Sequence, residues 1–129
     1  MIGLDCLKQP KQNIMPPCND CESPVYSMYL IRVKSEVYKE DLPILPSFIQ
    51  GTFADICEVL KRDPIGCCGL LSKNKGGKLR GYRSISLDYG GIAYRIIYRI
   101  CDRPAPRRVE IIAVGEHDVA YENAQGRVI

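Results

Sequence analysis

The chain has 129 residues and a mass of 14.5 kDa, enough for one compact domain, and its 46% hydrophobic and 26% charged residues are typical of a globular protein. It contains no apolar run of about 18 residues, which excludes a membrane-spanning helix, and its first ten residues lack the order of a secretory signal. Seven cysteines without an export signal indicate reduced thiols, so we expect a cytoplasmic protein without a disulfide framework.

Charge is unevenly distributed along the chain. Residues 73–108 contain ten lysines or arginines and two acids, a net charge of +8, whereas the remaining 93 residues carry −5. A basic surface of this kind is typical of proteins that bind a polyanion such as nucleic acid. A solvated surface neutralised by an acidic partner protein would give the same pattern, and charge alone does not separate the two.

The first 24 residues are predicted to form an irregular extension, because they contain four prolines and no hydrophobic period. The predicted domain covers residues 25–129. Met28 lies at the edge of this domain and is an alternative start residue. We therefore expect the extension to be a disordered segment or an artefact of start-site assignment.

Two helices are expected after a first strand over residues 25–33, which are rich in β-forming side chains. The first helix is short, with Ser35 as its cap and Pro43 as its end. The second is amphipathic, because apolar residues recur at helical spacing over 49–60 and the pair 63–64 (Asp-Pro) ends it. Ser47 and Gln50 have the spacing of a capping box at its start.

Three strand-like runs follow a loop predicted over residues 65–78. Two glycines after Tyr89 suit a hairpin between the first two runs. Helices grouped on one side of a mainly antiparallel sheet define an α+β fold. The predicted order is strand–helix–helix–strand–strand–strand, with a two-helix hairpin on one face and a short C-terminal helix over 118–127. The three strand-like runs are residues 79–88, 92–102 and 108–115.

Side-chain alternation divides the strand over 92–102 into two faces. An apolar row belongs against the helices, while Arg95 and Arg99 lie on the opposite face, about 7 Å apart. We expect that face to be open. The apolar row is Tyr94, Ile96, Tyr98 and Ile100.

The preceding strand adds hydroxyl groups beside these arginines. Ile85 and Leu87 should face the core, and Arg83 starts on the core side but is near the strand end, where a long side chain can reach out. Guanidinium groups are well matched to phosphate, because their planar fork donates two parallel hydrogen bonds. The hydroxyl-bearing residues on the arginine face are Tyr82, Ser84 and Ser86.

The chain has a single histidine, His117, directly after the last strand, and Tyr121 follows four residues later. An imidazole can exchange a proton near neutral pH, so His117 is a candidate acid or base. A lone histidine is more often structural, and its spacing leaves both roles open.

Taken in order, these motifs resemble the RelE/ParE superfamily of type II toxin–antitoxin toxins. Residues 38–46 and the helix that ends at 63–64 are similar to the helical hairpin of that family. The resemblance covers residues 28–125 and implies a small α+β sheet with two helices packed on it. The motifs are Lys78–Arg83 (KLRGYR), Tyr94–Ile100 (YRIIYRI), Val109–Gly115 (VEIIAVG), and His117 with Tyr121.

The resemblance implies a toxin that inhibits translation and arrests growth, restrained by a cognate antitoxin. RelE-like members cut messenger RNA on the ribosome through attack of the ribose 2′-hydroxyl on the neighbouring phosphate, with no metal or cofactor. By position, Arg95 would stabilise the phosphate, and His117 and Tyr121 would be the acid–base pair. Arg83 is a further catalytic candidate, and the candidate substrate contacts are Lys78, Arg80, Ser84, Ser86 and Arg99.

The chain departs from RelE at Ser84 and Ser86, where RelE has two lysines. Hydroxyls do not supply the missing positive charge, although Arg80, Arg83 or Arg99 could. ParE-like members lack the nuclease residues and poison DNA gyrase. A gyrase inhibitor and an inert member that only binds its antitoxin therefore stay open as alternatives.

Cysteine spacing gives little support for a metal. Cys18 and Cys21 have the separation of a ligand pair, but a zinc site needs four ligands and a second matching pair is missing. Cys57 and Cys101 are better explained as small core residues. We expect no metal site.

Overall fold

The structure is a computed structural model, and it describes residues 28–67 and 72–128. The predictions for residues 1–24, including the irregular extension and the pair Cys18 and Cys21, lie outside the described residues. Within these ranges, no helix combines the length and the apolar character needed to cross a bilayer.

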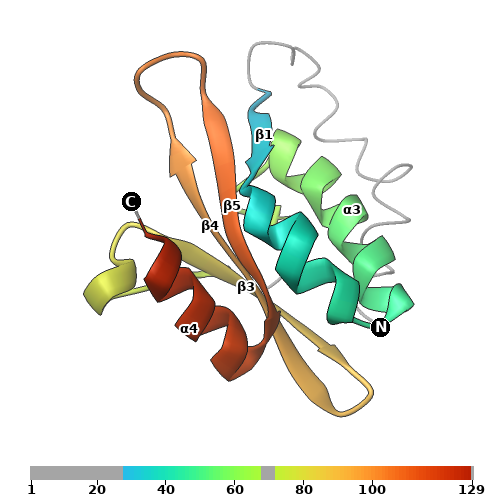
Figure 1. The fold of residues 1–129 in the computed structure, drawn as a ribbon. Coiled ribbons are helices and arrows are strands. Elements are labelled where there is room, and N and C mark those ends of the chain that lie inside the picture. Colours follow the sequence, from blue (N-terminus) through green and yellow to red (C-terminus); the bar gives the residue numbers. More distant parts are fainter. Residues whose placement is uncertain (1–27, 68–71, 129) are drawn as a thin grey trace.

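The fold is α+β and is built around a five-stranded sheet of order β1-β5-β4-β3-β2 (Figure 1). β1 pairs in parallel with β5, and the other three pairs are antiparallel, so the predicted class and mainly antiparallel sheet are confirmed. The strands are β1 (Leu30–Val33), β2 (Ser72–Asn74), β3 (Arg83–Tyr89), β4 (Ile92–Cys101) and β5 (Arg108–Glu116).

The boundaries of β3 and the presence of β2 differ from prediction. β2 lies in the stretch expected to be a loop, and its three residues become a strand only by pairing with β3. β3 starts four residues later than expected because Gly77–Leu79 forms a 3-10 turn. The β3–β4 hairpin is confirmed: Gly90 and Gly91 have φ values of 61° and 80°, which glycine adopts without strain.

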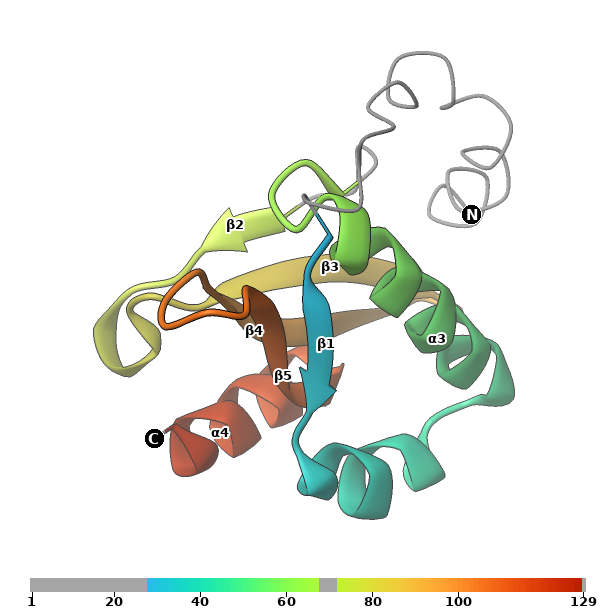
Figure 2. The same ribbon diagram turned by 90° about the horizontal axis from the view of Figure 1, so that it is seen from above.

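Together with the 3-10 turn Gly77–Leu79, two α-helices and two further short helical segments complete the described part of the fold. The first predicted helix is instead a π-helical segment that continues into a 3-10 turn (Figure 2). Pro43 lies within this turn rather than ending the helix, at a position where the missing N–H costs no hydrogen bond. The elements are the π-helix Val37–Asp41, the 3-10 turn Leu42–Ile44, α3 (Ser47–Arg62) and α4 (His117–Arg127).

The predicted capping box at the start of α3 is wrong. Pro46 precedes the helix, Ser47 is its first residue, and no side chain caps it. The amide of Gln50 instead donates hydrogen bonds to the carbonyls of Leu42 at 2.8 Å and Leu45 at 2.9 Å. These carbonyls belong to the preceding turn, so Gln50 fastens α3 to that turn rather than to its own first residues.

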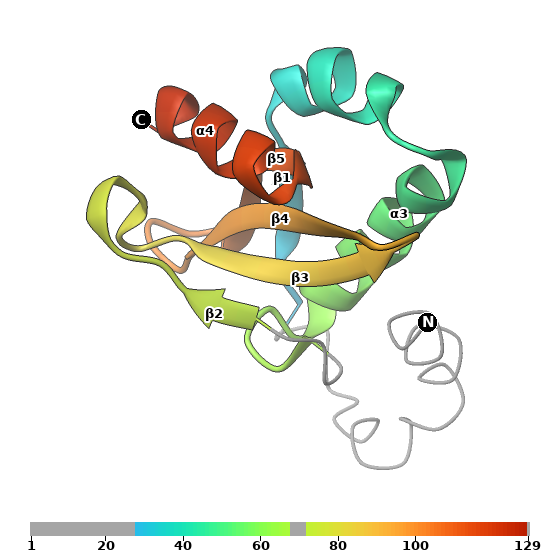
Figure 3. The ribbon, with the colours of Figure 1, turned by 90° about the horizontal axis from the view of Figure 1, so that it is seen from below.

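Both faces of the sheet are covered, which corrects the expectation of an open face. α3 and Val37 pack on the face that carries Ile96 and Tyr98. α4 lies across β4 on the other face (Figure 3). Ala120 and Ala124 pack there against strand residues. The strand residues beneath α4 are Ile97, Ile112 and Ala113.

A bulge in β5 widens the apolar area under α4. The ladder register shifts between Ile97, which pairs with Ala113, and Tyr98, which pairs with Ile111. Ile112 is the extra residue, and it joins Ala113 in the core beneath α4. The α4 face is thus apolar around the bulge, and polar side chains occupy the positions beside it.

A buried ion pair fixes the C-terminal end of α4. Both oxygens of Asp41 accept hydrogen bonds from the guanidinium of Arg127, at 2.8 and 3.0 Å, and the two side chains are 1% and 9% exposed. Asp41 also accepts the N–H of Val114 at 3.0 Å, and Arg127 donates to the carbonyl of Ile112 at 2.9 Å. The pair therefore joins the π-helical segment, β5 and α4.

Candidate active site

Arg95 lies in the middle of β4, between Ser86 of β3 and Gly115 of β5. Its half-buried side chain is on the α4 face, and Nη1 donates to the carbonyl of Tyr94 at 2.9 Å. Among the described residues, no carboxylate forms an ion pair with it. Its positive charge is therefore not neutralised by a carboxylate of the described residues.

Tyr121 reaches the same place from α4. Its hydroxyl donates to Oγ of Ser84 at 3.3 Å, and Nζ of Lys75 lies 4.6 Å from the centroid of its ring. Burial raises the pKa of Tyr121, but contacts with Ser84, Lys75 and Arg95 together outweigh burial and hold the pKa below its ordinary value of 10.0. The phenol is therefore a stronger acid than free tyrosine.

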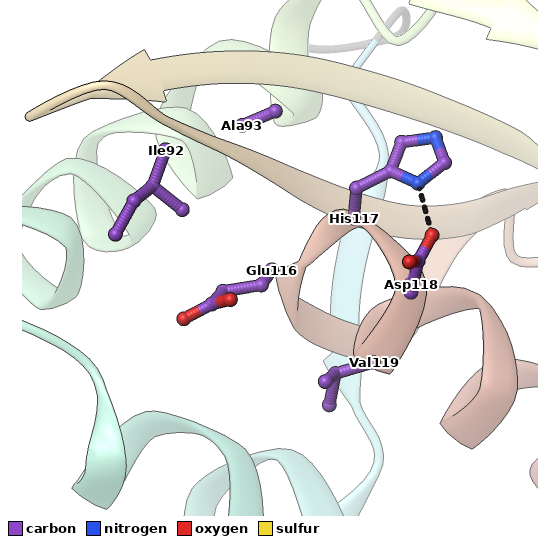
Figure 4. A pocket seen from close by; sticks show the side chains of 6 residues that line it. All are labelled: Ile92, Ala93, Glu116, His117, Asp118 and Val119. Carbon is purple, nitrogen blue, oxygen red and sulfur yellow. Dashed lines mark hydrogen bonds and ion pairs between the residues drawn. The ribbon is translucent and has the colours of Figure 1, made fainter.

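His117 starts α4, one turn before Tyr121. The two rings meet edge to face, with centroids 4.7 Å apart. Nδ1 of His117 lies 2.8 Å from Oδ1 of Asp118 (Figure 4). Because a carboxylate only accepts, Nδ1 carries the proton and Nε2 is the acceptor of the neutral ring. The side chain is 46% exposed, so an incoming substrate can reach it.

An open pocket of about 340 Å³ borders His117, where the start of β4 meets the start of α4 (Figure 4). Its lining is partly apolar and includes two carboxylates. The lining residues are Ile92, Ala93, Glu116, His117, Asp118 and Val119.

We define the α4 cluster as the side chains of five residues that meet between α4 and the sheet: Lys75, Ser84, Arg95, His117 and Tyr121. Four of them were candidates from the sequence, and Ser86, a fifth candidate, is next to Arg95 across the ladder. Lys75 was missed as a site residue. The basic composition of residues 73–78 was its one indication, and its position depends on the fold of that segment, where its N–H donates to the carbonyl of Tyr82 at 2.9 Å.

Arg83 is not brought into the cluster. It pairs with Tyr98 in the ladder and, by alternation, lies on the same side of β3 as Ile85, which is in the α3 core. Its Nη1 donates to Oδ1 of Asn74 on β2 at 2.9 Å. This bond draws the side chain towards β2, whereas from the sequence we expected it to reach towards the face of Arg95.

Arg99 has its charge balanced within the protein. Its guanidinium lies 2.8 Å from Glu110, which also accepts from Arg108 at 3.0 Å. Burial raises the pKa of Glu110, but the hydrogen bonds and charges of the two arginines outweigh burial and lower it below its ordinary value. Lys78 and Arg80, by contrast, are exposed beside the 3-10 turn and remain candidates for substrate contact.

No three or more His, Cys, Asp or Glu side chains in the described ranges are grouped to hold a metal ion. Family models, curated proteins and solved structures contain no match to this chain. The chemistry of the α4 cluster is therefore the basis for assigning a function.

Proposed function

We propose that this protein is a RelE/ParE-type toxin that cleaves messenger RNA on the ribosome, without metal or cofactor, and is restrained by a cognate antitoxin. The α4 cluster carries this proposal. It combines a guanidinium that has no ion-pair partner among the described residues with an oriented imidazole and a tyrosine of lowered pKa. In the same proposal, residues 37–44 and α3 correspond to the family's helical hairpin.

Cleavage of RNA by its own 2′-hydroxyl needs one proton acceptor, one proton donor and a cation. The 2′-oxygen bonds to phosphorus as the bond from phosphorus to the 5′-oxygen breaks, which leaves a 2′,3′-cyclic phosphate and a 5′-hydroxyl. Nε2 of His117 takes the proton of the 2′-hydroxyl, and the phenol of Tyr121 protonates the departing 5′-oxygen. Arg95 stabilises the charge on the non-bridging oxygens.

The experiment is cleavage of mRNA on programmed ribosomes by the purified protein. We expect fragments with 2′,3′-cyclic phosphate ends, formed equally well in the presence of a metal chelator. Arg95→Ala should lower the rate about 10²–10³-fold, the effect of removing one preorganised donor, and should relieve growth arrest. Arg62→Ala, which removes an exposed arginine of α3, is the control and should act as the unaltered protein does. Full toxicity of Arg95→Ala would contradict the nuclease proposal.

Inhibition of DNA gyrase is the second candidate. Ser84 and Ser86 favour it, because a nuclease of the RelE type has lysines at these two strand positions. Purified gyrase would then lose supercoiling activity on addition of the protein while ribosome-bound mRNA stays intact. An inert, antitoxin-binding member would show neither effect.

The antitoxin proposal has an electrostatic basis. Residues 73–108, with a net charge of +8, would attract an acidic antitoxin segment that folds on binding. An antitoxin segment bound over the α4 cluster would keep RNA from reaching it.

A further inference from the structure

Lys75 occupies a position that the motif comparison did not single out. It lies between β2 and the 3-10 turn Gly77–Leu79, 46 residues before the tyrosine that it contacts. Its Nζ is 4.6 Å from the centroid of the Tyr121 ring, and its backbone N–H is held by the carbonyl of Tyr82 at 2.9 Å. The contact therefore joins a short connection near the sheet edge to the first turns of α4.

We propose that Lys75 is a positioning residue for Tyr121: its ammonium holds the ring beside β3 and stabilises negative charge on the phenol oxygen. This inference rests on the proposed function, in which Tyr121 gives a proton to the leaving 5′-oxygen. A cation over an aromatic face attracts the ring, and near the oxygen it also lowers the energy of the phenolate.

The other groups that face Tyr121 do not replace Lys75. Ser84 on β3 is neutral and accepts the hydrogen bond of the phenol. Arg95 on β4 is already bonded to a main-chain carbonyl and is assigned to the phosphate. His117, earlier on α4, meets the ring through its edge and binds Asp118. Among the described groups beside Tyr121, Lys75 is thus the cation to which the proposed function assigns no other role.

The titration of Tyr121 tests the inference without any enzyme assay. Lys75→Met removes the charge and keeps a long side chain, and the ultraviolet absorbance of phenolate reports ionisation. Subtracting the titration of the matching Tyr121→Phe protein isolates Tyr121. We expect its midpoint to move to higher pH in Lys75→Met and to return in Lys75→Arg, while Lys78→Met, which alters an exposed lysine nearby, leaves it in place.

An unchanged midpoint in Lys75→Met, or an equal shift in Lys78→Met, would overturn the inference. Should Lys75→Met fail to fold, as judged by circular dichroism, Lys75→Gln tests the same charge with a polar side chain.

The rate of RNA cleavage gives a second readout. Loss of Lys75 should slow cleavage roughly tenfold, part of the 10²–10⁴-fold that a general acid contributes. The alkaline limb of the pH–rate profile should move to higher pH, because Tyr121 then loses its proton later. A slower rate with an unmoved limb contradicts the role assigned to Lys75. A protein that cleaves no RNA, but whose Tyr121 midpoint moves as expected, contradicts the proposed function alone.

Discussion

The two arginines of β4 differ because of the residues that pair with them on β5. Arg95 is opposite Gly115, which has no side chain, whereas Arg99 is opposite Glu110, which binds it at 2.8 Å. The sequence pattern treated the two arginines as equivalent because alternation along a single strand places both on the same face and says nothing of the residues opposite them. Cross-strand partners decide which guanidinium is available, and they became visible only with the β4–β5 register.

Glu110→Gln gives a prediction for the dependence of stability on pH. The folded-state pKa of Glu110 lies below its ordinary value of 4.5, so its ion pairs stabilise the protein fully above that value. This stabilisation is lost as the pH falls through the folded-state pKa. The difference in unfolding free energy between the unaltered protein and Glu110→Gln should therefore be largest near neutral pH and shrink in acid.

Urea denaturation across a pH series measures this difference. Glu58→Gln is the matched control, because Glu58 is 65% exposed and its ion pair within residues 28–67 and 72–128 is with Lys61 on its own helix. If the difference in unfolding free energy between the unaltered protein and Glu110→Gln is the same at every pH, the ion pairs of Glu110 do not stabilise the fold.

Elements with a strong hydrophobic period were predicted well, and elements that depend on pairing or capping were not. α3 follows from its apolar stripe, and the β3–β4 hairpin follows from two glycines between β-forming runs. β2 has three residues and no pattern of its own, so its partner β3 defines it. The C-terminal helix was expected over residues 118–127, close to α4, but its packing on the arginine face of the sheet was not, because α4 buries two alanines rather than large apolar side chains.

The candidate site was predictable where local alternation and chain order determine position. Ser84 and Arg95 share a face by alternation, and Tyr121 follows the last strand closely enough to fold back over that face. Arg83 lies on the opposite side of β3 and bonds to Asn74 of β2, a partner that alternation along β3 does not indicate. Lys75 was missed because it lies in an irregular connection, where the sequence has no helical or strand periodicity that predicts the position of a side chain.

At the level of whole elements, the pair Asp41 and Arg127 should dominate the attachment of α4. Arg127→Met leaves a carboxylate that is 1% exposed without its counter-ion, which should lower the unfolding free energy by about 3–5 kcal/mol. The double variant Asp41→Leu/Arg127→Met should recover much of that loss, because no unpaired charge stays buried. Urea denaturation measures both, with Arg62→Met as an exposed control. If the loss of unfolding free energy in the double variant equals the sum of the losses in the two single variants, Asp41 and Arg127 do not stabilise the protein as a pair.

The molecule as a whole is electrically divided, with its positive excess in residues 73–108. These residues include β3, β4 and the connection after β2, and so contribute Lys75, Ser84 and Arg95 to the α4 cluster. The remaining two residues of the cluster come from α4. Basic residues around the α4 cluster attract the phosphates of an RNA strand. In the proposed function this attraction brings one phosphate to the groups that act on it.

Salt dependence tests this arrangement for the whole surface. Binding of a 2′-O-methyl RNA, which lacks the attacking hydroxyl and is not cleaved, should weaken with salt with a log–log slope of about −0.7 per phosphate neutralised. Lys78→Gln/Arg80→Gln removes two exposed charges beside the cluster and should reduce the steepness of the slope by about 1.4 if each contacts one phosphate. Lys39→Gln/Arg62→Gln removes the same charge from exposed helical residues outside the basic segment, so it should leave the slope nearly unchanged. Equal reductions in the two proteins would mean that RNA responds to net charge alone, and that the basic segment is not its binding surface.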